Sequence, residues 1–461
     1  MRMKCIVVYM VFLAGLILTG CTDSKSRWTR EAMDDMMLGE DAFADPAIER
    51  KLPDLSDKSA LGDYLVYAAL NNATLEASFN RWKAALESIP QVEALPDPRF
   101  TYRYFIEEVE TRVGAQRQSF DLSQTFPWFG KLKLRGDAAM AASEVVRQRF
   151  KSDKLAVFYK VKDAWYEYYY LKQAIEITKE NIELIKHIEG IARVRYKAAV
   201  GGHPDVIRAQ VELGKLIDRL ATLTDLRTPI VAKLNAALNR RSESPLPWPA
   251  EAPDVAAVVS DEQLLALQAK HNPEVKALDF EIVRQKHRIE LAKKEYFPDV
   301  TLGVTYVDTA GATGAMSPSD SGKDPVVAMV SVNLPIWRDK LDAGVRQARY
   351  RRSAAISEKQ QKVNSLGAAL KLATYGFRDA ARKVGLYRDT LVPQAIQSLK
   401  ATEASFRAGK ASFTDMVDAE RILLEFKLAQ ERALSNKAQR FAELEMLVGT
   451  KISDDGNAKQ Q

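Results

Sequence analysis

The chain has 461 residues, 46% of them hydrophobic and 28% charged, and its 67 Lys and Arg exceed its 61 Asp and Glu by six. With only 22 Gly and 18 Pro, this composition supports a sizeable core and excludes disordered and collagen-like chains. The basic excess is too small to indicate nucleic-acid binding, and two Cys with four His exclude a metal site rich in those ligands. We therefore expect no metal, no cofactor and no nucleic-acid partner.

The first residues of the chain have the pattern of a secretory signal. Arg2 and Lys4 precede an apolar run over residues 5–18, which is shorter than the roughly 20 residues that span a bilayer. A basic start, a short apolar segment and small residues before a cleavage site are typical of exported proteins. The sequence predicts a signal peptide over residues 1–20.

The signal ends in Leu-Thr-Gly-Cys at residues 18–21, which resembles the lipobox of bacterial lipoproteins. In that motif, cleavage exposes the cysteine for acylation, so Cys21 is the predicted lipidation site and residues 21–60 are the lipidated N-terminal segment. Several acyl chains provide a lasting anchor, at about 0.8 kcal/mol per buried CH₂. Thr22 stands in place of the Asp that is common in inner-membrane lipoproteins, which favours the outer membrane. The alternative is an ordinary signal peptide in which the cysteine is incidental.

The sequence contains an internal duplication. Three segments recur in the same order, at offsets that grow from 200 to 210 residues. The matched pairs are Asn71–Ala77 with His271–Ala277, Phe126–Leu132 with Leu334–Leu341, and Tyr196–Ala209 with Phe406–Ala419. We infer two copies, residues 61–240 and 261–450, joined by a Pro-rich linker at 241–260 and followed by a polar tail at 451–461.

Each copy contains a pair of strands in which apolar and polar residues alternate. The predicted strands lie at about 99–109 and 117–127 in the first copy and at about 299–309 and 326–336 in the second. About nine to eleven residues cross a bilayer when a strand is tilted. The alternative is a soluble four-stranded sheet with one buried face, but the exported start favours membrane strands. Because four strands cannot close a barrel and open edges are not tolerated in lipid, three chains would supply twelve strands.

Long helices make up most of the rest of each copy. They are predicted at about 131–195 and 205–240 in the first copy and at about 340–406 and 412–448 in the second. The first of them contains no proline, and at ~1.5 Å per residue it forms a rod of about 95 Å. Apolar residues recur along it every seven positions between residues 161 and 182, which predicts coiled-coil packing. Such a rod fits a tube or a stalk better than a compact globule.

The whole pattern resembles the TolC-like outer membrane efflux proteins, from about Leu61 to Gly449. The segments that carry the resemblance are Gln124–Leu132, Tyr296–Val300, Phe406–Gly409 and Asp415–Ala419. The lipobox and the Pro-Trp-Phe-Gly-Lys turn at residues 127–131 are most similar to the lipid-anchored branch of the family, which serves heavy-metal and drug efflux.

The resemblance implies an α+β membrane protein built from a duplicated helix–β-hairpin–long-helix repeat. It implies a homotrimer with a 12-stranded β-barrel in the outer membrane of a Gram-negative bacterium, continued by an α-helical coiled-coil tunnel in the periplasm. Such a trimer would dock to a periplasmic adaptor protein and an inner-membrane pump, and would passively conduct metal ions, drugs or other small molecules.

An alternative function is that of a lipid-anchored periplasmic coiled-coil scaffold or adaptor without a pore. Neither function is enzymatic. The sequence contains no phosphate-binding loop of the Gly-x-x-x-x-Gly-Lys-Ser/Thr type, no His-Glu-x-x-His and no Gly-x-Ser-x-Gly. We therefore expect no catalytic activity.

The resemblance also implies a periplasmic gate formed by acidic residues. Asp415 and Asp418 match the gate acids of the family in position, and Asp205 is the counterpart of Asp415 in the first copy. A spacing of three places Asp415 and Asp418 on one helix face, so a trimer would have six carboxylates at a narrow opening. Such a ring would favour cations and resist anions. The alternative is that either residue caps the helix that follows Gly409.

Two positions depart from the lock that holds this gate shut in the family. Ala411 stands where a basic residue is customary, and Phe406 replaces a tyrosine and so lacks its hydroxyl. We hypothesise that Lys410 or Arg407 provides the missing charge.

Overall fold

The computed structural model describes residues 52–253, 255, 260–313 and 318–452. The chain divides into two compact units. The described part of the first unit is Lys83–Glu144 with residues 280–313 and 318–354, and the second comprises what is described of Ala42–Trp82, Val145–Asp279 and Ala355–Gln461. The predicted signal peptide and the lipidation site Cys21 lie outside the described residues, as does the polar tail beyond Ile452.

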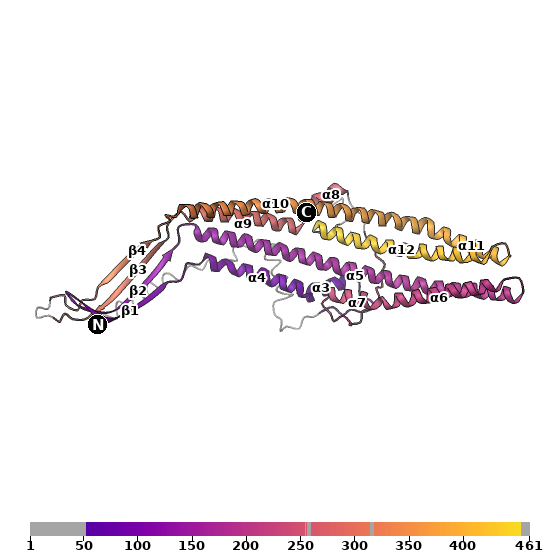
Figure 1. Ribbon diagram of the computed structural model, residues 1–461, viewed down its shortest axis with the longest axis horizontal. Helices are drawn as coiled ribbons and strands as arrows, with labels where there is room; N and C mark the ends of the chain where they lie inside the picture. The colour runs from indigo at the N-terminus through magenta and orange to yellow at the C-terminus, as the bar shows by residue number, and fades with distance from the viewer. Residues whose placement is uncertain (1–51, 254, 256–259, 314–317, 453–461) are drawn as a thin grey trace. The chain divides into compact units, whose positions relative to one another are not determined.

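An antiparallel sheet belongs to the first unit (Figure 1). Its described strands, in spatial order, are β1 (Arg99–Thr111), β2 (Gly114–Phe126), β3 (Val300–Thr309) and β4 (Val326–Val332). Each copy of the repeat contributes one hairpin, and the pairing of β2 with β3 joins the two hairpins. β1 and β4 therefore form the edges, and neither has a further strand beside it within the described part of the chain.

Several strand boundaries differ from those that the sequence predicts. β1 runs on to Thr111 and β2 begins at Gly114, so that only two residues connect them. Gly114 takes a φ of 131°, and a Cβ at this position would overlap the carbonyl oxygen of Ala310. β4 ends at Val332, before the predicted residue 336, because Pro335 has no N–H to continue the ladder.

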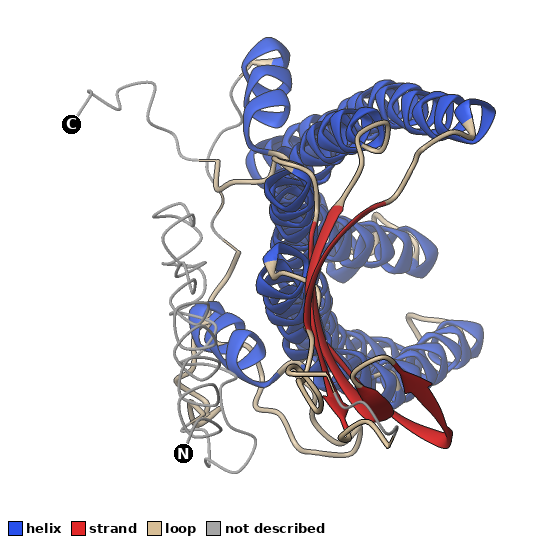
Figure 2. Ribbon diagram, turned by 90° about the vertical axis from the view of Figure 1, so that its left-hand side faces the viewer, coloured by secondary structure: helices blue, strands red, loops and turns tan. Residues whose placement is uncertain are grey.

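The pairing register separates the two faces of this curved sheet (Figure 2). One face carries the cross-strand row Tyr102–Phe120–Tyr306–Val326, and the next row, on the opposite face, is Thr101–Asp121–Thr305–Val327. The first face is apolar and exposed, since Tyr102 is 51% and Val330 73% exposed. On the second face Asp121 is 9% exposed, although Val327, on the edge strand β4, is 50% exposed. A soluble sheet would bury its apolar face, so this pattern favours membrane strands over a soluble sheet.

The turn after β2 binds the segment before β3. Lys131 is 1% exposed, and its Nζ donates hydrogen bonds to Oδ1 of Asp299 at 2.9 Å and to the carbonyl oxygen of Phe297 at 3.2 Å. The same ammonium group lies 3.4 Å from a carboxylate oxygen of Glu295. The backbone N–H of Trp128 also donates to Asp299, and the Trp128 ring stacks on Phe297 with centroids 5.2 Å apart. The Pro-Trp-Phe-Gly-Lys turn thus ties the first hairpin to the second.

Each copy runs through two helices, the two strands, a long helix and a returning helix. In the first copy the helices are α3 (Leu61–Asn71), α4 (Ala73–Glu93), α5 (Lys131–Lys197), α6 (His203–Asp225) and α7 (Arg227–Ala237). In the second copy they are α8 (Asp261–His271), α9 (Pro273–Lys294), α10 (Arg338–Leu386), the π-helical segment η2 (Tyr387–Leu391), α11 (Val392–Arg407) and α12 (Phe413–Val448). Among the described helices, none is both long enough and apolar enough to cross a bilayer.

Two of the predicted long helices are interrupted. The helix predicted over 205–240 divides at Leu226 into α6 and α7, and the helix predicted over 340–406 changes into the π-helical segment η2. Pro229 and Pro393 follow these interruptions, and each lacks the N–H that continues an α-helical hydrogen-bond ladder. α5 contains no proline and runs for 67 residues without a break.

In the second unit, α5 packs through its sevenfold apolar repeat. Val161, Tyr168, Ile175 and Ile182 are at most 8% exposed, as coiled-coil packing requires. Near its C-terminal end, α5 shares a buried cluster with α6 and α12. This cluster holds together the ends of the two helix hairpins that carry the candidate site.

Replacement of Lys131 by Met removes the cation from a buried position with three acceptors. We expect the Lys131→Met variant to lose about 3 kcal/mol of stability, because it leaves the Asp299 carboxylate without its ion-pair partner. Thermal or denaturant unfolding of the purified protein in detergent measures this loss. The exposed neighbour Lys133 offers the control, and an equal loss in Lys133→Met would contradict the assignment.

Candidate gate at the ends of the helix hairpins

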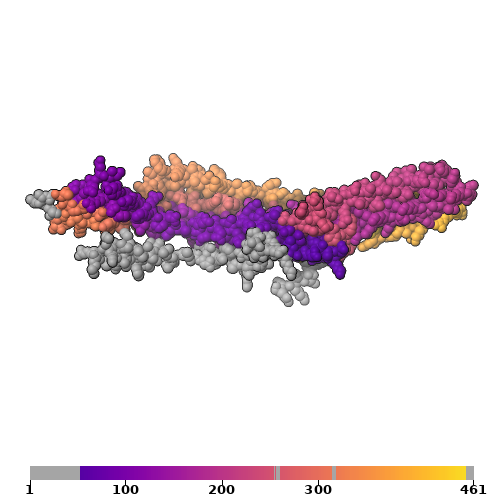
Figure 3. Space-filling model, turned by 90° about the horizontal axis from the view of Figure 1, so that it is seen from below, coloured from indigo at the N-terminus to yellow at the C-terminus, as the bar shows by residue number. Residues whose placement is uncertain are grey.

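Two helix hairpins end beside each other in the second unit. They are α5–α6, which turns at residues 198–202, and α11–α12, which turns at residues 408–412; Figure 3 shows the first in magenta and the second in yellow. Ala199 and Gly409 hold left-handed φ values of 55° and 74° in the two turns. These positions are 210 residues apart, so the duplicated copies build the same turn at equivalent places.

Asp415 caps its own helix. The backbone N–H of Ser412 donates to Oδ2 of Asp415 at 2.9 Å, and the N–H of Asp415 donates to Oγ of Ser412 at 3.1 Å. Hydrogen bonding by the Ser412 side chain, and then by the Ser412 backbone N–H, holds the pKa of the Asp415 carboxyl below its ordinary value. The helix cap, which the sequence analysis gave as the alternative to a gate role, is therefore present at Asp415. The Asp415 carboxylate is ionised and exposed, and a charged ring requires both of these properties.

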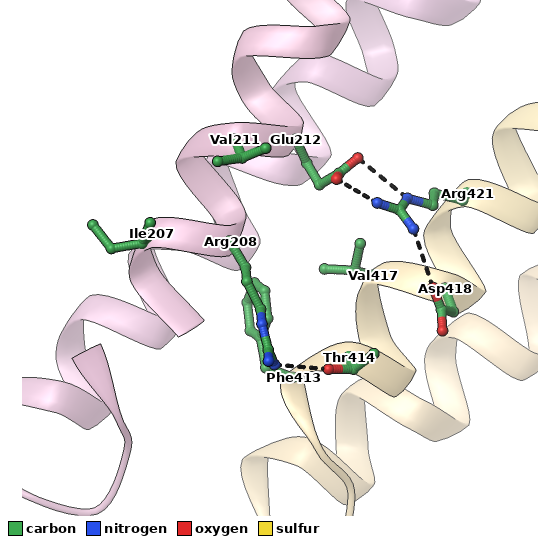
Figure 4. Close-up of a pocket in the computed structure, with 9 residues that line it drawn as sticks. All are labelled: Ile207, Arg208, Val211, Glu212, Phe413, Thr414, Val417, Asp418 and Arg421. Carbon is green, nitrogen blue, oxygen red and sulfur yellow. Dashed lines mark hydrogen bonds and ion pairs between the residues drawn. The ribbon is translucent and has the colours of Figure 1, made fainter. Parts of the chain in front are cut away.

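Asp418 lies one turn further along α12, next to Arg421 (Figure 4). Nη1 of Arg421 is 3.4 Å from Oδ1 of Asp418, and the same guanidinium group binds both carboxylate oxygens of Glu212 on α6. Burial alone would raise the pKa of Glu212, but hydrogen bonds from Arg421 and Lys215 outweigh burial and lower it. Arg421 thus joins the two hairpins and lies between the two carboxylates.

Asp205 occupies the first turn of α6, on the neighbouring hairpin. Its Oδ1 is 3.9 Å from Nη1 of Arg208, and that nitrogen donates to Oγ1 of Thr414 at 2.9 Å. The structure therefore brings Asp415 and Asp418 together on one helix, while Asp205 is linked to that helix only through Arg208 and Thr414 among the interactions of the described residues.

A cavity of about 350 Å³ lies between α6 and α12 at this end (Figure 4). It is lined by Ile207, Arg208, Val211, Glu212, Phe413, Thr414, Val417, Asp418 and Arg421. Ile207 and Val211 are 45% and 51% exposed, so the cavity combines ion pairs with apolar surface that is open to solvent.

The hairpins are also joined by an arginine that the sequence analysis missed. Arg195 of α5 donates from Nη1 to the carbonyl oxygen of Phe406 at 2.5 Å and from Nη2 to the carbonyl oxygen of Val200 at 3.2 Å. Its guanidinium carbon lies 4.7 Å from the centre of the Phe406 ring. Phe406 is thus held through its ring and its carbonyl, and needs no hydroxyl for this contact. The duplication gave no signal, because Ser405, at the equivalent position, has no charge.

Of the two cations that the sequence suggests for the lock, Arg407 has other side-chain contacts. Nη2 of Arg407 lies 2.5 Å from Oε1 of Glu403, one turn earlier on α11, and 3.3 Å from Nε2 of His187 on α5. The backbone N–H of Lys410 donates to the carbonyl oxygen of Ser405 at 2.8 Å. The lock role of Lys410 or Arg407 stays a prediction. Within the described part of the chain, no group of three or more His, Cys, Asp or Glu could hold a metal ion.

The chain is similar to known proteins in sequence. Residues 264–450 match the family model described as outer membrane efflux protein. The cobalt-zinc-cadmium resistance protein CzcC of Cupriavidus metallidurans is 20% identical over 392 residues, which are 84% of this chain and 88% of that protein.

Solved structures share the fold. The outer membrane protein VceC of Vibrio cholerae matches with a TM-score of 0.69 and 16% identity, over 85% of this chain and 97% of that one. The outer membrane channel MtrE of Neisseria gonorrhoeae, solved in its open state, matches with a TM-score of 0.68 and 16% identity, over 86% and 90% of the two chains. The predicted resemblance is therefore confirmed. Because the family is one of efflux proteins, the prediction that the chain is not an enzyme is confirmed too.

The pair of Arg421 and Glu212 can be tested by exchanging its charges. We expect Arg421→Glu to loosen α12 from α6 by about 1–2 kcal/mol, because Glu212 then faces a like charge. The double variant Glu212→Arg with Arg421→Glu should recover most of that loss. Amide hydrogen exchange across residues 413–424 measures the local opening. Additive effects of the two substitutions would show that the pair does not join the hairpins.

Proposed function

We propose that this chain, which belongs through residues 264–450 to the outer membrane efflux protein family, forms a homotrimeric duct across the outer membrane. The observation that carries the proposal is the sheet, whose exposed face is apolar and whose edge strands β1 and β4 have no partner in the described chain. Lipid cannot satisfy the hydrogen-bonding groups of those edges. Three chains pair them edge to edge and close a barrel of twelve strands.

The helix hairpins then continue the barrel as a coiled-coil tunnel in the periplasm. The buried sevenfold repeat of α5 and the exposed ion pairs along α5, α6 and α12 suit a wall that faces water. A lipid-anchored scaffold without a pore is disfavoured, because it gives no reason for an exposed apolar face on the sheet.

The duct works as one part of a three-component efflux system of a Gram-negative bacterium. A periplasmic adaptor and an inner-membrane pump would load it, and the lipidated Cys21 would anchor it to the outer membrane. The cargo is metal ions, drugs or other small molecules; the name of the relative CzcC, a cobalt-zinc-cadmium resistance protein, supports metal ions.

The ends of the helix hairpins form the gate of this duct. In a trimer, Asp415 and Asp418 supply six carboxylates to the opening, and Asp205 adds its charge from the neighbouring hairpin. Arg421 offsets part of the charge of Asp418, whereas the ionised Asp415 has hydrogen bonds only to Ser412 among the described residues. The ring attracts cations and repels anions, and the ties through Arg195 and Arg421 keep it narrow.

Conductance in planar bilayers tests the duct and its gate together. We expect ion conductance that is selective for cations, and we expect Asp415→Asn with Asp418→Asn to reduce the cation-to-anion permeability ratio by about tenfold, as the loss of ~1.4 kcal/mol of attraction predicts. Glu262→Gln, on the peripheral helix α8, serves as the control and should leave the ratio unchanged. A protein that never conducts would favour the scaffold.

Labelling with radioactive palmitate tests the anchor separately. We expect the full chain to incorporate the label and Cys21→Ser to lose it, since Cys21 is the residue that acylation needs. Cys5→Ser is the matched control, because Cys5 leaves with the signal peptide and labelling should persist. Equal labelling of wild type and Cys21→Ser would mean that the lipobox is incidental.

A further inference from the structure

α12 carries a buried carboxyl group close to the gate. Glu420 is 2% exposed and lies two residues beyond Asp418. Asn181 of α5, itself 6% exposed, hydrogen-bonds to it, and Glu212 of α6 is close enough to repel it. One side chain of the second copy therefore lies against both helices of the first hairpin.

The hydrogen bonds of this carboxyl group are incomplete. Oε1 of Glu420 and Oδ1 of Asn181 are both buried, and neither has a partner among the described residues. Both atoms are acceptors when Glu420 is ionised, and a buried acceptor without a donor is costly. A proton on Glu420 supplies the missing donor, since a carboxylic acid and an amide can each donate to the other.

Within the described part of the chain, no cation forms an ion pair with Glu420. Arg421 is bound to Glu212 and Asp418, and Lys215 of α6 lies 2.9 Å from Glu212. The groove beside Glu420 also contains Arg219 of α6 and Glu425 of α12. On the α5 side, Glu180 pairs with Lys427 at 3.1 Å. Burial is the main cause that raises the pKa of Glu420, to about 7. The hydrogen bond with Asn181 opposes it in part, and the smaller effects are repulsion by Glu212, which raises the pKa, and attraction by Arg421, which lowers it.

We propose that Glu420 is a proton-operated latch of the gate, which holds α12 against α5 and α6 when it is protonated and favours their separation when it is ionised. The latch rests on the proposed function, because it acts on the hairpins that form the gate. Separation exposes Glu420 to water and returns its pKa towards the ordinary value of 4.5.

The direction of the pH dependence follows from the pKa of Glu420, which is about 7 when the hairpins are together and about 4.5 when they are apart. Below about pH 4.5 the carboxyl is protonated whether the hairpins are together or apart, and the closed arrangement keeps its full stability. Between about 4.5 and about 7 the proton is lost more readily from the separated hairpins, so opening becomes up to tenfold more favourable per pH unit in each protomer. Above about pH 7 the effect levels off.

Amide hydrogen exchange of the purified full chain tests the latch without any need for conductance. The protection of residues 413–424 is measured and corrected for the intrinsic pH dependence of exchange. We expect wild type to lose protection at least tenfold between pH 5 and pH 7. Glu420→Gln, whose neutral amide resembles the protonated acid in shape, should stay protected at both pH values. Glu425→Gln, an exposed carboxyl in the same groove, should respond like wild type. An unchanged pH response in Glu420→Gln would overturn the latch.

Recordings in planar bilayers, with the pH varied on the side of the gate, separate this proposal from the proposed duct. The latch predicts that wild type opens more often as the pH rises from 5 to 7 and that Glu420→Gln does not. Conductance with equal pH dependence in both proteins would overturn the latch and leave the duct intact. If protection falls with rising pH in wild type but not in Glu420→Gln, and neither protein conducts, the latch is supported and the proposed duct is contradicted.

Discussion

The unpaired edges of the sheet are the constraint on which the rest of the account depends. A β-strand in lipid must have all its backbone groups hydrogen-bonded, and the described chain leaves one side of β1 and one side of β4 open. The exposed apolar rows, such as Phe100 with Leu122, make water an unsuitable solvent for the same sheet. Both demands are met at once when identical chains pair edge to edge in a membrane, and a symmetric assembly brings the hairpin ends around one axis.

The duplication explains why the two hairpins resemble each other in backbone and differ in charge. Asp205 and Asp415 are shared, but the equivalent positions that follow hold different side chains in the two copies: Arg208 with Asp418, Gln210 with Glu420 and Val211 with Arg421. The second copy therefore carries the capped acid, the bridging arginine and the buried carboxyl, while the first supplies Glu212 and Asn181 as their partners. The hairpins share one turn geometry, and the differences in side chains create the contacts between them.

Sequence periodicity predicted the elements better than it predicted their ends and contacts. Alternation located all four strands, and the sevenfold repeat of α5 identified a buried face. The interruptions before Pro229 and Pro393 were missed although a proline inside a predicted helix is a signal for a break. Arg195 and Glu420 could not be found from the sequence, since burial and pairing depend on which helices meet, and a charged residue in a charged helix carries no local signal.

The mass of the purified protein in detergent distinguishes a trimer from a monomer. We expect one species with close to three times the mass of the mature chain, because three chains pair every edge of β1 and β4 in a barrel of twelve strands. A stable monomer that remains soluble in water without detergent would contradict it, since such a protein would have to cover both the open strand edges and the apolar face by itself.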